Sequence, residues 1–274
     1  MIVLRSGGKD HRDSGFALLL VLWALILLSL IITQLLAAGR RETQLASNLR
    51  QAAFAETLAD NAVQTTIFHL MTRANGRLAN TIQTVVLPGG TSTVHVRNLA
   101  GLVNPNMAPG PLLTALLEEC AAAPSAAVHL SQSITDWRSP NDDLHKIIAT
   151  YRAAGLTYAP SGRAFQTRDE IRLVLGMTPA IADCLVPHLS VYGDAEMPAP
   201  AFADPLVLRS LMRMMRQNGA GLAAMAPDQT GSLAVEIIVD AASGSARFVR
   251  DTTVRFSDSD ATRPYRILTW QRGD

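Results

Sequence analysis

The hydrophobic positions of the chain begin with one uninterrupted run and then change to a helical repeat. The 23 residues from Phe16 to Ala38 carry no charge. As a helix, such a run spans about 34 Å, which is enough to cross a bilayer core of about 30 Å. From Glu42 to Arg73, apolar residues recur at spacings of three, four and seven, which predicts an amphipathic continuation of the same helix. We therefore expect one helix of over 50 residues that ends at Asn75-Gly76.

Strand-like patterns lie on both sides of a long helical block. Thr81 to Leu87 and Thr91 to Asn98 are rich in Val and Thr, and Pro88-Gly89-Gly90 between them predicts a hairpin. Three further strands are expected near the end of the chain, over Leu233 to Val239, Ala246 to Phe256 and Pro264 to Gln271.

The block between these strands carries helix start signals. Several of its helices begin with proline at the first helical position. Thr167 and Glu170 have the spacing of a capping box. The expected helices are Gly110 to about Ala123, Ser125 to Trp137, Asp143 to Ala154, Ile171 to Leu175, one after Thr178-Pro179, and one from Asp204-Pro205 to Asn218-Gly219.

The order of elements predicts an α+β fold. A long helix is followed by two strands, a helical block and three strands. The economical interpretation is one antiparallel sheet packed on the long helix, with an all-helical domain inserted into the sheet. The alternative, separate domains in series, leaves two small sheets with exposed edges.

Composition and motifs exclude several classes of protein. The formal net charge is only +1, so no strong field draws the chain to nucleic acid. The sequence has no Gly-x-Ser-x-Gly elbow, no His-Glu-x-x-His motif and no phosphate-binding loop, and its six histidines lack the spacing of metal ligands. We expect neither an enzyme nor a nucleic-acid partner.

Charges around the apolar run indicate its orientation in a membrane. Arg5, Lys9 and Arg12 precede it, which favours a cytoplasmic N-terminus, whereas Arg40 and Arg41 beyond it favour the opposite. Because the leader is short and the region after the apolar run is long and exported, we favour the cytoplasmic N-terminus. We expect a single-pass inner-membrane protein whose C-terminal domain is periplasmic.

The junction Ser14-Gly15-Phe16 resembles a type IV prepilin leader. A secretory signal has its cleavage site after the apolar region, whereas here the small residue Gly15 lies directly before it. The resemblance implies that prepilin peptidase cuts between Gly15 and Phe16 and methylates the new amino group of Phe16. The apolar helix would then remain on the mature protein.

Further features resemble the K-type minor pseudopilins of the type II secretion system. Leu20 occupies the fifth mature position, where pilins usually have glutamate and K-type proteins lack it. The last strand, Tyr265 to Trp270, and the large size of the chain also match that family. The helical block carries segments close to the family's motifs in the same order: Asn104-Pro105-Asn106, Ile134 to Arg138, and Asp169 to Met177.

This resemblance implies a structural role at the tip of the pseudopilus. It implies a complex with the I- and J-type minor pseudopilins, initiation of pseudopilus assembly, support for export of folded proteins, and contact with exported cargo. Leu20 is consistent with a tip position because a buried glutamate is useful only where a neighbouring amino terminus can pair with it. A bulky inserted domain would likewise block another subunit from stacking above.

The resemblance also suggests a division of the chain around a pilin-like core. The expected parts are a prepilin leader (1–15), a transmembrane stem (16–38), the first part of the pilin core (39–103), the inserted helical domain (104–230) and the C-terminal strands of the core (231–274).

Two residue sets have open alternatives. Cys120 and Cys184 either form one disulfide in an oxidising compartment or remain two buried thiols. The resemblance implies calcium in the helical domain, and Asp136, Asp142 and Asp143 are the candidate ligands. Because Ser139 and Asn141 stand where relatives repeat aspartate, the same residues are also consistent with helix capping and a solvated turn.

Two other functions compete with the pseudopilin hypothesis. A minor pilin of a type IV pilus would share the leader and stem, although the helical insertion disfavours it. A signal-anchored periplasmic binding or hydrolytic domain would keep its leader and contain a pocket with convergent polar groups.

Overall fold

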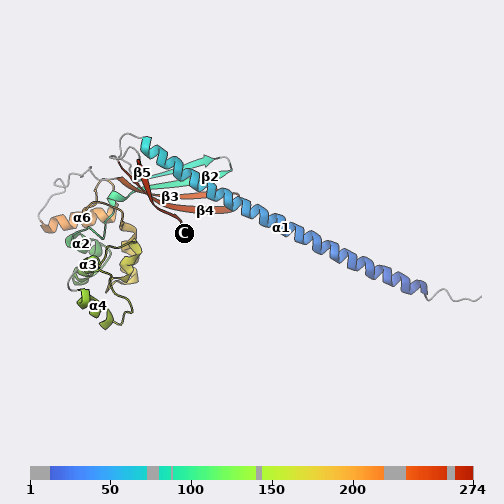
Figure 1. The fold of residues 1–274 in the computed structure, drawn as a ribbon, viewed down its shortest axis with the longest axis horizontal. Coiled ribbons are helices and arrows are strands. Elements are labelled where there is room, and N and C mark those ends of the chain that lie inside the picture. Colours follow the sequence, from blue (N-terminus) through green and yellow to red (C-terminus); the bar gives the residue numbers. More distant parts are fainter. Residues whose placement is uncertain are drawn as a thin grey trace, which may run out of the picture.

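The computed structural model describes residues 13–72, 80–87, 89–139, 144–218, 233–257 and 263–273. Figure 1 shows a long helix that projects away from a sheet, and a group of helices beyond the other end of that sheet. The strands lie beside the C-terminal half of the long helix, and its N-terminal half extends away alone.

The long helix, α1, runs from Asp13 to Thr72 and has 60 residues, which confirms the prediction of one continuous helix. Gly39 lies within it and does not end it. One apolar face of its second half, which includes Ala59 and Val63, lies on the sheet, whereas Phe68, Asn61 and Gln64 are exposed. This face has the amphipathic spacing found in the sequence.

The five strands form a single antiparallel sheet in the order β1-β2-β3-β4-β5. The central pair joins β2 to β3, with Asn98 opposite Val235, so strands from both sides of the helical block meet in one sheet. One sheet is confirmed, and the alternative of two small sheets is wrong. The strands are β1 (Thr81–Leu87), β2 (Gly90–Asn98), β3 (Leu233–Ser243), β4 (Ala246–Phe256) and β5 (Tyr265–Arg272).

The helices between β2 and β3 follow the predicted start signals. Thr178 caps α5, since its hydroxyl oxygen accepts a hydrogen bond from the Ile181 amide at 3.3 Å. Asp204 caps α6 in the same way, through the amides of Leu206 and Val207 at 3.0 Å. The α-helices are α2 (Gly110–Glu119), α3 (Pro124–Arg138), α4 (Leu144–Ala153), α5 (Pro179–Leu185) and α6 (Pro205–Asn218).

Two helical predictions need correction. Helix α2 ends at Glu119 rather than near Ala123, because Ala121 has a φ of 62° and cannot continue a right-handed helix. The segment after the Thr167–Glu170 capping box is a 3-10 helix, Arg168–Leu173, rather than an α-helix to Leu175. Further 3-10 turns cover Leu99–Gly101 and Val186–His188.

Two large hydrophobic cores hold the described part of the molecule together. One lies between α1 and the sheet and includes Val63, Ile67 and Ile237. The other lies within the helical insertion and includes Leu116, Ile134 and Leu211. Since the insertion has its own core, it is fixed to the sheet by a limited set of contacts from β2, β3 and β4 and by a small apolar cluster of Leu99, Leu102 and Ala234.

Candidate assembly surfaces

The N-terminal half of α1 is the membrane candidate. Leu18–Leu35 has a mean hydropathy of 2.7 and is the one helix long and apolar enough to cross a membrane in the part of the chain that the structure describes. Leu20 lies within this segment and is 56% exposed, so no other part of the described chain covers it. A surface of this kind requires lipid or neighbouring apolar helices around it.

The predicted processing site lies at the start of α1. Gly15 and Phe16 both lie in helical backbone, and the Phe16 side chain is 68% exposed. Residues 1–12 lie outside the described part of the chain. Cleavage and methylation at this site remain predictions.

The junction between sheet and insertion is polar and lies on the face of the sheet opposite α1. Glu236 of β3 is 7% exposed there, and its carboxylate accepts a hydrogen bond from Arg168 Nη1 at 3.1 Å. Arg97 Nε of β2 lies 3.5 Å from the same carboxylate, and Arg97 Nη2 donates to the Pro187 carbonyl at 2.8 Å. One buried carboxylate thus joins two arginines, one from the sheet and one from the insertion.

A second arginine of the sheet contacts the insertion in a similar way. Arg255 of β4 donates from Nη2 to the Tyr192 carbonyl at 2.9 Å and lies 3.1 Å from Asp194 Oδ1. The sequence signal for the junction was a charged residue, Glu236, within the apolar strand LAVEIIV. This residue was not identified from the sequence as part of a junction.

Close backbone packing completes the junction. A β-carbon added at Gly101 would collide with the carbonyl oxygen of Phe202, so only glycine fits. The Ala199 amide donates to the Ala100 carbonyl at 2.7 Å, and Val103 pairs with Leu189 in an isolated parallel bridge. These contacts bring the beginning of the insertion next to the segment 189–202, which precedes α6.

A cavity of about 240 Å³ lies at this junction. Charged and hydroxyl side chains make up much of its lining, among them Arg168, Asp251 and Thr253. Ligand pockets of drug size usually have volumes of about 300–1,000 Å³ and mostly apolar walls. The cavity is therefore a polar gap between two parts of the fold, and it gives no support to the anchored binding-domain alternative.

The three family-like motifs of the helical block meet in space. Asn106 forms two hydrogen bonds with the backbone of Phe165, donating to its carbonyl at 3.0 Å and accepting from its amide at 2.7 Å. Arg138 donates to the Pro105 carbonyl at 2.7 Å and to the Ala108 carbonyl at 2.9 Å. Burial lowers the pKa of the Arg138 guanidinium, but two carbonyl acceptors satisfy it.

Aromatic side chains fill the centre of this arrangement. Trp137 stacks on Phe165 with ring centroids 5.7 Å apart, and the Tyr151 ring lies 6.0 Å from Trp137 on another side. The Tyr151 hydroxyl accepts a hydrogen bond from the Leu175 amide at 2.9 Å, which connects the third motif. Burial raises the pKa of the Tyr151 phenol. The motifs thus stabilise the insertion's core, and Phe165 is a partner that was not predicted from the sequence.

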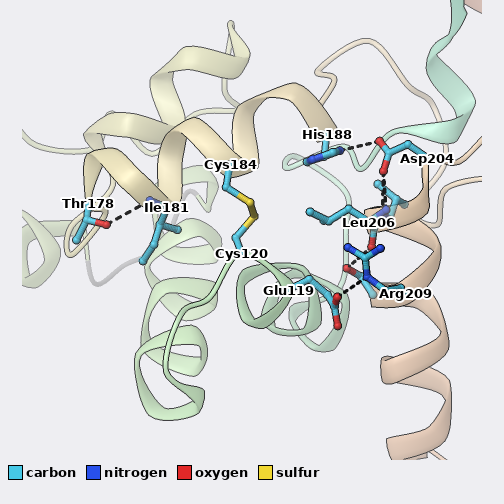
Figure 2. Close-up of a disulfide and its surroundings, with 11 residues drawn as sticks. Glu119, Cys120, Thr178, Ile181, Cys184, His188, Asp204, Leu206 and Arg209 are labelled. Atoms are coloured by element: carbon cyan, nitrogen blue, oxygen red, sulfur yellow. Dashed lines mark hydrogen bonds and ion pairs between the residues drawn. A yellow bond between two sulfur atoms is a disulfide. The ribbon is translucent and has the colours of Figure 1, made fainter.

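Cys120 and Cys184 are joined by a disulfide with a Cα–Cα distance of 5.7 Å (Figure 2). The bond connects the end of α2 to α5, which are 64 residues apart in the sequence. The segment 170–189, two short helices around Gly176, packs its Ile171 and Leu185 into the core of the insertion.

Two polar side-chain pairs lie on the α6 side of the disulfide (Figure 2). Glu119 accepts hydrogen bonds from Arg209 at 2.8 Å and from Arg213 at 2.6 Å, so α2 and α6 are linked next to Cys120. Hydrogen bonds from Arg209 and then Arg213 lower the pKa of the Glu119 carboxyl. His188 Nδ1 lies 2.6 Å from Asp204 Oδ2 at the start of α6.

The calcium candidates are only partly described. Asp142 and Asp143 lie outside the described residues. Asp136 accepts a hydrogen bond from Gln132 at 2.8 Å, and the described residues contain no cluster of three or more His, Cys, Asp or Glu side chains suited to a metal. Calcium takes about six to eight oxygen ligands, and calcium binding by Asp136, Asp142 and Asp143 stays a prediction.

Comparisons with known proteins agree on one family. The model of the family "Type II secretion system (T2SS), protein K" matches residues 95–194. The type II secretion system protein K of Klebsiella pneumoniae is 23% identical over 174 residues. That match covers 60% of this chain and 50% of the relative, so the chain spans about half the length of the curated relative it matches.

A solved structure shares the fold. The crystal structure of the GspK-GspI-GspJ complex from the type 2 secretion system of enterotoxigenic Escherichia coli contains a chain that matches with a TM-score of 0.59 and 16% identity. The match covers 86% of this chain and 99% of that chain. The fold is therefore pilin-like with an inserted helical domain, and all three comparisons show similarity to proteins of the type II secretion system.

Proposed function

We propose that this protein occupies the tip of a type II secretion pseudopilus, initiates its assembly and supports export of folded proteins across the outer membrane. The observation that carries the proposal is the helical insertion between β2 and β3, whose part up to residue 194 lies within the segment 95–194 that matches the protein K family. It lies at the end of the sheet away from the membrane segment (Figure 1). A subunit stacked above would have to occupy the same space.

Leu20, which stands where pilins usually have glutamate, gives independent support to the proposed position at the tip. Inside a bundle of apolar helices, a carboxylate is stabilised only by a nearby positive charge, such as the free amino terminus of an adjacent subunit. Leu20 cannot form that pair, and it carries no cost where one neighbour is missing. A terminal position in the filament needs this property.

Partners and processing follow from the same proposal. The I- and J-type minor pseudopilins are the expected partners, because the structurally similar chain was solved with GspI and GspJ. Prepilin peptidase would cut before Phe16 and methylate it, so the chain is a substrate and not a catalyst. The protein would stand in the inner membrane with its N-terminus cytoplasmic, its C-terminal domain periplasmic and the insertion in reach of exported cargo.

The experiment that tests the proposal compares two phenotypes of a deletion strain. Loss of secreted enzymes from the medium with normal twitching and adhesion supports a pseudopilin. Loss of twitching or adhesion with normal secretion would assign the chain to a type IV pilus instead. Complementation by a chain that lacks only residues 104–230 should not restore secretion if the insertion is needed at the tip.

A further inference from the structure

The face of α1 that lies on the sheet combines small residues with larger apolar ones, among them Leu58. Ala55, Ala59 and Ala62 are at most 5% exposed and lie against the sheet beside Val63 and Ile67. Small side chains let a helix approach closely but provide little interlocking along its axis. The apolar face therefore holds the helix on the sheet more firmly than it fixes its position along the axis.

The same apolar spacing continues beyond the sheet, toward the membrane segment. Leu45 and Leu49 extend the stripe and are 60% and 63% exposed. A shift of α1 by one turn, about 5.4 Å, would place Ala55, Ala59 and Val63 where Ala59, Val63 and Ile67 now lie. These three contacts would stay apolar, and the shift would be opposed in this face only by Gln51 entering the buried place of Ala55 and by Leu58 entering the smaller place of Ala62. The apolar pattern therefore favours the observed register without providing a polar contact that is specific to it.

A polar contact distinguishes the registers. Arg250 of β4 is 7% exposed and points toward α1. Its Nε donates to Asp60 Oδ1 at 2.8 Å, and its Nη2 donates to Glu56 Oε1 at 3.0 Å. The guanidinium also lies over the rings of Phe248 and Trp270, with its carbon 4.7 and 5.0 Å from the ring centroids.

The two carboxylates are one helical turn apart, and no other acidic residue occurs between Thr43 and Thr72. A shift of α1 by one turn in either direction would therefore leave at most one carboxylate beside Arg250. Removing one partner of a buried guanidinium strongly destabilises the folded protein. Selection of one register is the best-attested role of buried polar pairs. The planar fork of arginine suits two acceptors at fixed positions.

We propose that Arg250 is the positioning residue that fixes the register of α1 on the sheet. The register sets the distance between the sheet and the membrane segment, because both belong to the same continuous helix. This inference concerns the geometry of one chain and does not depend on the proposed role in secretion.

A nearby contact can report the register. Gln51 Oε1 of α1 accepts hydrogen bonds from Ser245 in the turn between β3 and β4, from its amide at 3.2 Å and its hydroxyl at 3.0 Å. Both residues are exposed enough to react. In a helix shifted by one turn, Ser47 would take the place of Gln51. The two native cysteines are joined to each other, so introduced cysteines would be the reactive thiols.

The experiment uses the full chain in its native membrane and a short bis-maleimide cross-linker. Pairs Q51C/S245C and S47C/S245C are compared in three backgrounds. With native residues, the 51–245 product should dominate. The double variant A52E/D60A places its carboxylates at positions 52 and 56, one turn earlier, so the 47–245 product should dominate. In R250L the yield of 47–245 relative to 51–245 should rise about tenfold, because the polar discrimination is gone.

An exposed ion pair on the same hairpin provides the matched control. Asp240 and Arg247 lie on the side of the β3–β4 hairpin away from α1, so D240N/R247Q should keep the native ratio of products. In R250L, Glu56 and Asp60 keep contact with water, so this variant leaves no buried charge without a partner. R250L therefore tests the proposal even if the A52E/D60A protein does not accumulate. An unchanged ratio in R250L would overturn the proposal.

Discussion

Gly101 occupies the point where the sheet passes into the insertion, and its environment has no space for a side chain. We expect Gly101→Val to lower the free energy of unfolding by about 3 kcal/mol or more, because overpacking here pushes against backbone atoms of Phe202 and Ala203. Urea unfolding followed by circular dichroism measures the effect. Gly110→Ala is the matched control, since the nearest atom to its new carbon is Ser131 Oγ at 3.6 Å, and it should be near neutral.

The Glu119 carboxylate should make the stability of the insertion depend on pH. Its pKa is lowered in the folded state by Arg209 and Arg213, so the unfolded state binds protons more readily. Its contribution is therefore complete above the usual value of 4.5 and decreases as the pH falls through the lower folded value. We expect E119Q to be less stable than the native protein at pH 7 and the difference to shrink below about pH 4.

Urea titrations of both proteins at about pH 7, 5, 4 and 3 measure this difference across the range in which the carboxyl titrates. The difference in the free energy of unfolding between the native protein and E119Q could instead stay constant over the whole pH range. That result would show that the arginine contacts do not control the titration of Glu119.

For single residues, the sequence indicated which motifs are important but not which residues they contact. Trp137, Arg138 and Asn106 were singled out as family-like residues, and they do meet around one aromatic centre. Phe165 was missed because it lies in an irregular segment with no periodic neighbour, and its role is evident only when Asn106 binds its backbone. Glu236 was missed because its partners, Arg97 and Arg168, come from distant parts of the chain.

The helices and strands show why local signals worked well in this chain. Prolines at first helical positions and capping residues mark the starts of α5 and α6, and α-helical periodicity marks α1. Such signals depend on neighbouring residues only. The predicted end of α2 was wrong because a single residue, Ala121, has a left-handed backbone conformation, which an alanine in the sequence does not indicate.

The disulfide between α2 and α5 should stabilise the insertion. It closes a loop of 64 residues, for which the chain-entropy estimate is about 4 kcal/mol. We expect C120A/C184A to unfold at lower urea concentration than the native protein. The loss of stability should lie in the insertion and not in the contact of α1 with the sheet. Hydrogen exchange of the core amides of α2 and α3, compared with those of β3 and β4, measures the location of the loss.

Equal loss of protection in the helices and in β3 and β4 would show that the two cores unfold as one unit. Peptide mass analysis without reducing agent should first recover Cys120 and Cys184 in one linked fragment. Recovery of two free thiols would remove the basis for this prediction.

The whole molecule was predictable in architecture because the order of elements leaves few topologies. One sheet was favoured over two since two would leave exposed edges, and the β2–β3 pairing confirms this choice. The angle and contacts between insertion and sheet were not predictable, because they depend on Arg97, Arg168 and Arg255 reaching carbonyls and carboxylates across the junction.

Processing of the leader is a prediction about the whole chain in its membrane. Gly15→Val should block cleavage, because a branched side chain at that position hinders an extended backbone from entering a protease cleft. The unprocessed form would keep its leader of 15 residues, which the mass of the N-terminal peptide from native membranes measures. Gly39→Ala within α1 is a suitable control and should be cleaved normally. Methylated Phe16 in the Gly15→Val protein would contradict the leader assignment.

The position of the insertion has a consequence for the order of folding. Strands β2 and β3 are neighbours at the centre of the sheet, yet the whole helical block lies between them in the sequence. In the proposed orientation the chain is exported with its N-terminus anchored, so the insertion would leave the membrane before β3 does. Contacts within the insertion are local and form quickly, whereas the β2–β3 ladder must wait for a long loop to close. The helical insertion and its disulfide should therefore form first, and the sheet closes around a part that is already folded.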